Sequence, residues 1–175
     1  LPVAALFGVV RSSGTVGIDE KYVLVPKNNK PEGKMKRWMY VYLAVDCYTY
    51  DLLHIEIYPY NTKQSTRAFL LALRAKGYYP RVVVTDMRPA YQSVVPQVFP
   101  KAVHHECIFH ALQALREHAQ EVYGSHYAET HPQVVQLMQD IDAIFDTQTK
   151  RTAQRRYRKV LSQRELFESK NPNAK

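Results

Sequence analysis

The 175-residue chain is predicted to form an α/β fold, with a five-stranded mixed sheet flanked by helices and an all-helical C-terminal extension. Three strand-like runs follow one another in residues 15–60, helical and strand-like patterns alternate in residues 61–124, and only helical periodicity remains from residue 126. With 46% hydrophobic and 23% charged residues, the composition is that of a globular protein. It excludes an intrinsically disordered chain, a collagen-like repeat and a disulfide scaffold.

The first three strands are predicted at Thr15–Pro26, Trp38–Asp46 and Asp51–Tyr60, which are rich in β-branched and aromatic residues. The short link between the second and third runs predicts an antiparallel hairpin, and three strands in succession predict a meander. Asp46 and Asp51 flank the hairpin turn, where Asp is favoured because its carboxylate accepts hydrogen bonds from nearby backbone N–H groups. We therefore expect a structural role for both.

The next segment changes from a strand period to a helical one. Apolar positions recur at helical spacing in residues 64–77, with Ser65 and Thr66 as candidate caps and Gly77 at the end. A continuous apolar run, Arg81–Asp86, then predicts a buried strand whose C-terminal end carries a carboxylate.

Two further helices and one strand complete the predicted core. A short helix at 89–99 has Pro89 in its first turn, a strand follows at Ala102–Phe109, and a helix then runs to Gly124. We predict that residues 1–125 form the core.

Residues 126–175 are predicted to be a helical insertion or extension. Its first helix would be capped by Thr130, with Pro132 in the first turn, and would continue to about Phe145. A second helix at about 148–168 places apolar residues on one face and most of its Arg and Lys on the other. The two helices are expected to pack as an antiparallel pair.

Positive charge is concentrated at the C-terminal end of the chain. Nine of the 24 Lys and Arg residues, but only two of the 16 Asp and Glu residues, lie in residues 147–175. Such a basic segment predicts a polyanionic partner. The predicted contacts with its phosphates are basic residues of the 27–37 loop and of the last helix: Lys34, Lys36, Arg37, Arg151, Arg155, Arg158 and Lys159.

The sequence gives no indication of a membrane partner or an oxidising compartment. No run approaches the ~20 apolar residues of a membrane span. The two cysteines, Cys47 and Cys107, form no C-x-x-C motif, which is ordinary usage for a reducing compartment. The apolar N-terminus lacks a basic segment and an initiating Met, so we expect a cut inside a longer chain rather than a signal peptide.

Two carboxylates stand where an unpaired charge is costly to bury. Asp19 lies in the middle of the first strand, and Asp86 ends a run of three valines. Taken alone, Asp86 could cap the next helix and Asp19 could face solvent. If the two strands lie side by side, however, the carboxylates meet, and hard oxygen ligands at close range favour Mg²⁺ or Mn²⁺ between them.

A group of His and Cys residues near position 107 suggests zinc as an alternative. Alternation along a strand sends His104 and His105 to opposite faces, and the spacing of Cys107 and His110 lacks a second pair of ligands. We therefore expect Cys107 to lie in the core rather than to bind zinc.

The whole arrangement resembles the RNase H-like catalytic domain of DDE transposases. The likeness rests on the meander with Asp19, the helix, VVVTD, the next helix and FPKAVHHECIFHAL, and covers residues 15–124. It is closest to bacterial insertion-sequence transposases and the mutator-like group, whose C-x-x-H element corresponds here to Cys107 and His110. The resemblance implies that Asp19 and Asp86 hold two metal ions for DNA cleavage and joining, and that Cys107 and His110 support the site.

The family's third acidic position has no clear counterpart. It is a Glu on a helix, often in a T-N-N-x-x-E stretch, which this sequence lacks. Glu165, Glu168 and the still weaker Glu106 are candidates. Our preferred expectation is that residues 126–175 are a helical insertion and that the chain stops before the Glu, with an N-terminal DNA-recognition domain also missing.

The function predicted from this resemblance is that of the catalytic-core fragment of a DDE transposase, performing metal-dependent strand cleavage and strand transfer. The expected partners are transposon ends and target DNA, and the expected place is the bacterial cytoplasm at the nucleoid. A homodimer of the full-length protein stays open. The alternatives are an inactive nucleic-acid-binding fragment and another RNase H-like nuclease, such as an exonuclease. We expect the isolated chain to fold but to cleave DNA poorly.

Overall fold

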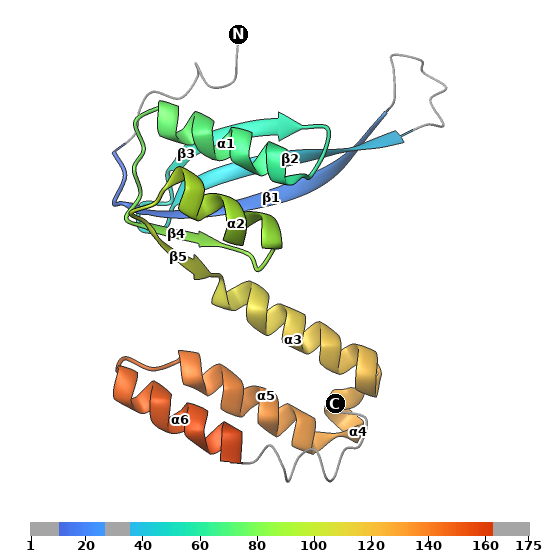
Figure 1. Ribbon diagram of the computed structural model, residues 1–175. Coiled ribbons are helices and arrows are strands. Elements are labelled where there is room, and N and C mark those ends of the chain that lie inside the picture. The colour runs from blue at the N-terminus through green and yellow to red at the C-terminus, as the bar shows by residue number, and fades with distance from the viewer. Residues whose placement is uncertain (1–10, 27–35, 163–175) are drawn as a thin grey trace. The chain divides into compact units, whose positions relative to one another are not determined.

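The computed structural model describes residues 11–26 and 36–162, without the side chains of Pro26, Lys36 and Arg37 (Figure 1). The chain divides into two compact units, with Cys107 ending the first and Ile108 beginning the second. The first unit contains β1 (Thr15–Pro26), β2 (Lys36–Asp46), β3 (Leu52–Tyr58), α1 (Lys63–Ala75), β4 (Val82–Thr85), α2 (Pro89–Val98) and β5 (Val103–Glu106). The second contains α3 (Ile108–Tyr123), α4 (Tyr127–Thr130), α5 (Pro132–Phe145) and α6 (Lys150–Ser162).

The five strands of the first unit form one mixed sheet in the order β3-β2-β1-β4-β5. β1, β2 and β3 pair antiparallel as a meander, whereas β4 pairs parallel with both β1 and β5. This is the RNase H-like arrangement predicted from the sequence. Because β1 lies at the centre, its carboxylates are neighbours of the end of β4.

The core of the first unit lies between the sheet and the helices α1 and α2 (Figure 1). Val16 and Ile18, which alternate along β1, are buried on this face. Asp19, the residue after Ile18, is exposed. α1 contributes Phe69, Leu70 and Leu73 to the core, all fully buried. The side chains of Asp19 and Glu20 therefore leave β1 on opposite faces of the sheet, with Glu20 on the buried face.

The hairpin turn between β2 and β3 is built around Asp46. Its side chain is completely buried and accepts hydrogen bonds from Ser12, Ser13, Tyr48 and Thr49. This confirms the structural role expected from its place beside the turn.

The N-terminus of α1 differs from the prediction. Thr62, not Ser65 or Thr66, is the N-cap, and its hydroxyl accepts a hydrogen bond from the Ser65 N–H at 3.2 Å. Thr66 lies one turn inside the helix, too far along to cap it, and its side chain is fully buried. Gly77 follows the helix with a φ of 92°, a left-handed conformation that glycine adopts without strain, so the predicted end is confirmed.

The predicted strand Ala102–Phe109 is too long. β5 ends at Glu106, whose partner Thr85 is the last residue of β4, and α3 begins at Ile108. With β4 ended there is no further ladder to pair with, so Ile108 and Phe109 adopt the helical conformation instead. The structural division at Cys107 thus precedes α3, and the domain boundary at residue 125 stays a prediction.

In the second unit, α5 and α6 pack against each other as predicted (Figure 1). The predicted cap is wrong, because Thr130 is the last residue of α4 and its hydroxyl donates to the His126 carbonyl at 3.1 Å. His131 occupies the N-cap position of α5. Within the described part of the chain, no helix is long and apolar enough to cross a membrane.

Candidate metal centre

Asp19 and Asp86, the two acidic residues singled out from the sequence, come together where β4 ends beside the middle of β1. In the parallel pairing of β1 with β4, Gly17 lies opposite Val84. Asp19 and Asp86 each follow two residues later, so they are adjacent across the two chain segments. One carboxylate oxygen from each of Asp19, Glu20 and Asp86 lies within 4.8 Å of the other two. Three carboxylates at this separation are a donor set suited to a divalent cation.

Glu20 was not among the predicted site residues. It continues the row of Val16 and Ile18, so its side chain begins on the helix-covered face and is only 6% exposed. The signal that could have identified it is this alternation, because a carboxylate on the buried face of a strand requires partners.

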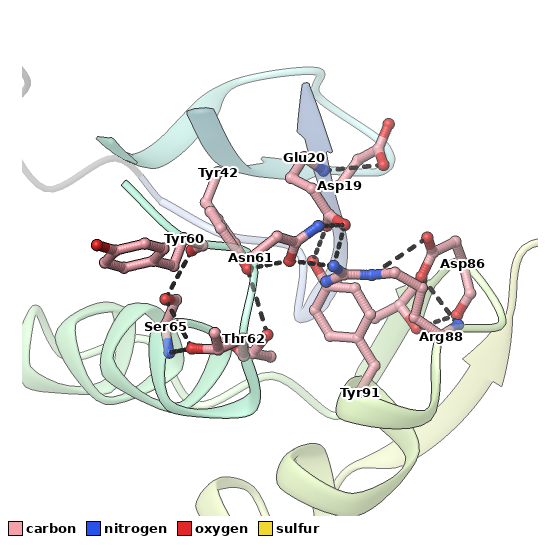
Figure 2. A network of polar contacts seen from close by, with 12 residues as sticks. Asp19, Glu20, Tyr42, Tyr60, Asn61, Thr62, Ser65, Asp86, Arg88 and Tyr91 are labelled. Atoms are coloured by element: carbon pink, nitrogen blue, oxygen red, sulfur yellow. Dashed lines mark hydrogen bonds and ion pairs between the residues drawn. The ribbon is translucent and has the colours of Figure 1, made fainter. Parts of the chain in front are cut away.

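Those partners are Asn61 before α1, Arg88 before α2 and Tyr91 within α2 (Figure 2). The Glu20 Oε1 atom lies 2.5 Å from Arg88 Nη1 and accepts a hydrogen bond from the Asn61 side-chain amide at 3.1 Å. The Tyr91 hydroxyl donates to Glu20 Oε2 at 2.6 Å. Burial raises the pKa of Glu20, and the contacts with Tyr91, Arg88 and Asn61 offset only part of that rise. Glu20 is thus held by three donors inside the protein.

Arg88 lies between Glu20 and Asp86. Its Nε atom is 3.5 Å from Asp86 Oδ2, and its backbone N–H donates to Asp86 Oδ1 at 3.1 Å. The guanidinium also donates to Asn61 Oδ1 and lies over the Tyr91 ring, 4.8 Å from the centroid. Burial alone would lower the pKa of Arg88, but Glu20 and the neighbouring tyrosines raise it by more. The pKa is therefore above its ordinary value, and the side chain stays charged. Arg88 therefore joins the loop after β4 to β1.

Asn61 extends this network into the core. Its side-chain oxygen accepts a hydrogen bond from the Tyr42 hydroxyl at 2.6 Å, and Tyr42 in β2 is completely buried. The residues linked in this way are Glu20, Tyr42, Asn61, Arg88 and Tyr91, which we call the Glu20 network (Figure 2). It connects β1, β2, the segment before α1, and α2. These contacts hold the Glu20 side chain in place on the helix-covered face of the sheet.

The remaining predicted site residues lie elsewhere. The Cys107 backbone N–H donates to the Thr85 carbonyl at 2.6 Å, and its thiol is not part of the acidic group. His110 belongs to α3 in the second unit and is half-buried. The supporting roles of Cys107 and His110 stay predictions. His104, one of the zinc candidates, pairs with the Thr85 hydroxyl at 2.8 Å, and Glu106 accepts a hydrogen bond from Gln92.

The basic residues of α6 differ in their surroundings. One group is exposed and recurs at helical spacing along one face, lining a surface hollow; we call it the arginine face, and it comprises Arg151, Arg155 and Arg158. Lys159, also a predicted DNA contact, instead pairs with Asp140 of α5 at 3.4 Å. Arg156 donates to the Ala143 and Asp146 carbonyls.

Several predicted residues are beyond what the structure describes. These are Lys34, the side chains of Lys36 and Arg37, and both late candidates for the third acidic position, Glu165 and Glu168.

The sheet order is that of an RNase H-like domain, and carboxylates from β1 and the end of β4 converge on a candidate site for a divalent cation. A family model described as a DDE domain matches residues 14–155. The chain therefore belongs to the DDE domain family of transposases. Membership of the mutator-like group stays a prediction.

The solved structures that are similar to this chain include two complexes. One is the simian T-cell lymphotropic virus intasome in complex with the PP2A regulatory subunit B56 gamma, with 14% identity, a TM-score of 0.45, and coverage of 85% of this chain and 50% of that one. The other is the Drosophila P element transposase strand transfer complex, with 12% identity, a TM-score of 0.43, and coverage of 71% and 35%. The chain thus spans half or less of the length of these two chains. No curated protein matches it.

Proposed function

We propose that the chain is the catalytic core of a DDE transposase in which Asp19 and Asp86 hold Mg²⁺ or Mn²⁺ for DNA strand cleavage and strand transfer. The convergence of carboxylate oxygens within 4.8 Å, from two strands far apart in the sequence, is the observation that carries this proposal. The bound metal would activate a water or a 3′-hydroxyl and stabilise the charge on the scissile phosphate.

The protein's own part is to fix the ligand atoms. The parallel pairing of β1 with β4 brings Asp19 beside Asp86, and the Asp86 carboxylate is oriented by the Arg88 backbone N–H. Hard oxygen donors favour Mg²⁺ and Mn²⁺ over softer metals, which is the reason for naming these two ions. Cys107 and His110 are proposed to support DNA handling, as the C-x-x-H element of the family suggests.

The arginine face of α6 is proposed to contact the DNA backbone. Its guanidinium groups are exposed and present the planar donors that suit phosphate oxygens. Phosphate contacts of this kind carry little base information, so this part of the binding is expected to be non-specific. Transposon ends and target DNA are the proposed substrates, and the full-length protein is proposed to act at the bacterial nucleoid, as a homodimer.

Metal binding by the 175-residue chain tests the proposal directly. Titration with Mn²⁺, followed by the electron paramagnetic resonance of the free ion, should detect binding that Mg²⁺ displaces. Asp19→Asn and Asp86→Asn should each weaken it at least about tenfold, because each removes a charged ligand. Asp51→Asn is the matched control, since Asp51 lies in the hairpin turn outside the acidic group.

DNA affinity provides the second measurement. A short labelled duplex should bind more tightly when Mn²⁺ is present, and Asp19→Asn and Asp86→Asn should remove this increment while the metal-free affinity stays the same. Mn²⁺ binding that neither variant alters, or that Asp51→Asn weakens equally, would refute the assignment of the site.

A further inference from the structure

The Arg88 guanidinium lies between two of the three carboxylates, those of Glu20 and Asp86 (Figure 2). It lies 2.5 Å from Glu20 Oε1 and 3.5 Å from Asp86 Oδ2, measured from Nη1 and Nε respectively. These contacts place a fixed positive charge where a cation bridging Glu20 and Asp86 would otherwise bind.

The Glu20 carboxylate is already occupied within the Glu20 network. Its Oε1 atom contacts Arg88 and the Asn61 amide, and its Oε2 atom accepts from the Tyr91 hydroxyl. Asp19 has no such donors among other described side chains, and its Oδ1 atom accepts only the neighbouring Glu20 N–H, at 2.9 Å. The two adjacent carboxylates of β1 thus differ in how available they are to a metal.

The charge balance follows the same division. Asp19, Glu20 and Asp86 carry three negative charges when ionised, and Arg88 reduces the local net charge to −2. A single divalent cation neutralises that charge. Without the guanidinium, the same oxygens would present a third unpaired negative charge within 4.8 Å of the others.

Resting on the metal site proposed above, we propose that Arg88 is a positioning residue that keeps Glu20 out of the metal coordination sphere and leaves Asp19 and Asp86 as the ligands. The guanidinium serves as an internal cation at the Glu20–Asp86 position. The metal is thereby confined to the exposed Asp19 side of the pair, where DNA can reach it.

This role makes a different prediction from a purely structural one. If Arg88 only braces the loop after β4, replacing it lowers stability and weakens or leaves unchanged the affinity for metal. If it excludes Glu20, replacing it releases a carboxylate beside Asp86, and metal affinity rises. The direction of the change in metal affinity therefore separates the two roles.

The experiment compares Mn²⁺ binding by wild type, Arg88→Met, Arg88→Lys, Glu20→Gln and the Arg88→Met/Glu20→Gln double variant. Arg88→Met should bind Mn²⁺ about tenfold more tightly, or take up a second ion, because the Glu20 carboxylate becomes available beside Asp86 as a further charged ligand. The double variant should return to wild-type affinity. Arg88→Lys retains the charge and should stay near wild type.

Arg81→Met is the matched control. Arg81 precedes β4 and donates to the Ser13 carbonyl, so it lies about 17 Å along the strand from Asp86. Its replacement removes the same charge from the same unit and should leave Mn²⁺ affinity unchanged. Thermal melting with and without Mn²⁺ gives a second readout, since a tighter site must produce a larger stabilisation by the ion.

Each result is decisive. A gain in affinity for Arg88→Met that disappears in the double variant supports the inference, even if the wild-type site proves too weak to detect. Unchanged or weaker binding by Arg88→Met overturns it, whereas the proposed metal site fails separately if Asp86→Asn has no effect on wild-type binding. A gain that persists in the double variant also overturns the inference, because Glu20 is then not the released ligand.

Discussion

Replacing Asp46 by Asn should destabilise the first unit by about 3 kcal/mol. The Asp46 side chain is completely buried at the end of β2. Its Oδ2 atom accepts from the Ser12 hydroxyl at 2.9 Å and the Ser13 N–H at 2.5 Å. Its Oδ1 atom accepts from the Ser13 hydroxyl at 2.8 Å and from the N–H groups of Tyr48 at 2.9 Å and Thr49 at 3.1 Å.

The size of the effect follows from these contacts. Asparagine can keep one acceptor oxygen toward the hairpin turn, but its amide NH₂ then faces the donors at the Oδ2 position. The Ser12 hydroxyl can rotate to accept, whereas the Ser13 N–H cannot. A hydrogen bond to a charged group contributes about 1.5–3 kcal/mol, and an unsatisfied buried N–H costs about 1–3 kcal/mol, so a loss of about 3 kcal/mol is expected.

The loss should depend on pH in a defined direction. Burial alone would raise the pKa of Asp46, but the hydrogen bonds that the carboxylate accepts lower it by more. The pKa in the folded protein therefore lies below its ordinary value. The contribution of the charged form is therefore fully present above about pH 4, near the ordinary Asp pKa, and is lost as the pH falls through the folded pKa. The difference between wild type and Asp46→Asn should shrink below pH 4.

Urea unfolding followed by circular dichroism at pH 7, 5 and 3 measures this difference. Asp51→Asn is the matched control, because Asp51 flanks the same turn and its carboxylate accepts no hydrogen bond from the described residues. The reasoning would be refuted by a difference below 1 kcal/mol at pH 7, or by one that is the same at pH 3 and pH 7.

Three further predictions concern the helical unit, the Glu20 network and a helix end. Replacing the arginine face of α6 by glutamines should weaken DNA binding. The slope of log binding constant against log salt concentration should fall by roughly 3, at about 0.9 per phosphate contact, as measured by fluorescence anisotropy across a salt series. Lys159→Gln should change this slope less, because Lys159 already pairs with Asp140. Tyr91→Phe should cost about 1–3 kcal/mol in urea unfolding, because the buried Glu20 carboxylate loses a donor; no loss would mean that water replaces the hydroxyl. Gly77→Ala should cost about 1 kcal/mol, since φ is 92° there, and equal stability would show that the turn relaxes.

The local patterns of the sequence were sufficient for the framework of the site. A carboxylate in the middle of a strand and another after a run of valines are recognisable without coordinates, because buried strands exclude unpaired charge. The meander followed by alternating helices and strands leaves few positions for β4, and it lies beside β1 as expected. Asp19 and Asp86 could therefore be paired from residue type and element order.

The partners of Glu20 could not be predicted in this way. Periodicity shows that Glu20 continues the buried face of β1. Its partners Arg88, Asn61 and Tyr91 reach it from later parts of the chain, and their geometry depends on how α1 and α2 pack on the sheet. Any of several polar residues could have faced that carboxylate. Only the packed structure determines which donor satisfies it.

Element ends and charge pairs depend on tertiary contacts for the same reason. β5 ends because its partner β4 ends at Thr85, which no local pattern in residues 102–109 reveals. The basic residues of α6 look alike in sequence and are mostly exposed, yet Lys159 pairs with Asp140 of α5 whereas the arginine face lines a surface hollow. The sequence by itself determined which residues carry charge and which faces are apolar, and tertiary packing decided which charges meet one another and which remain free for a ligand, because that choice depends on distances between elements remote in the chain.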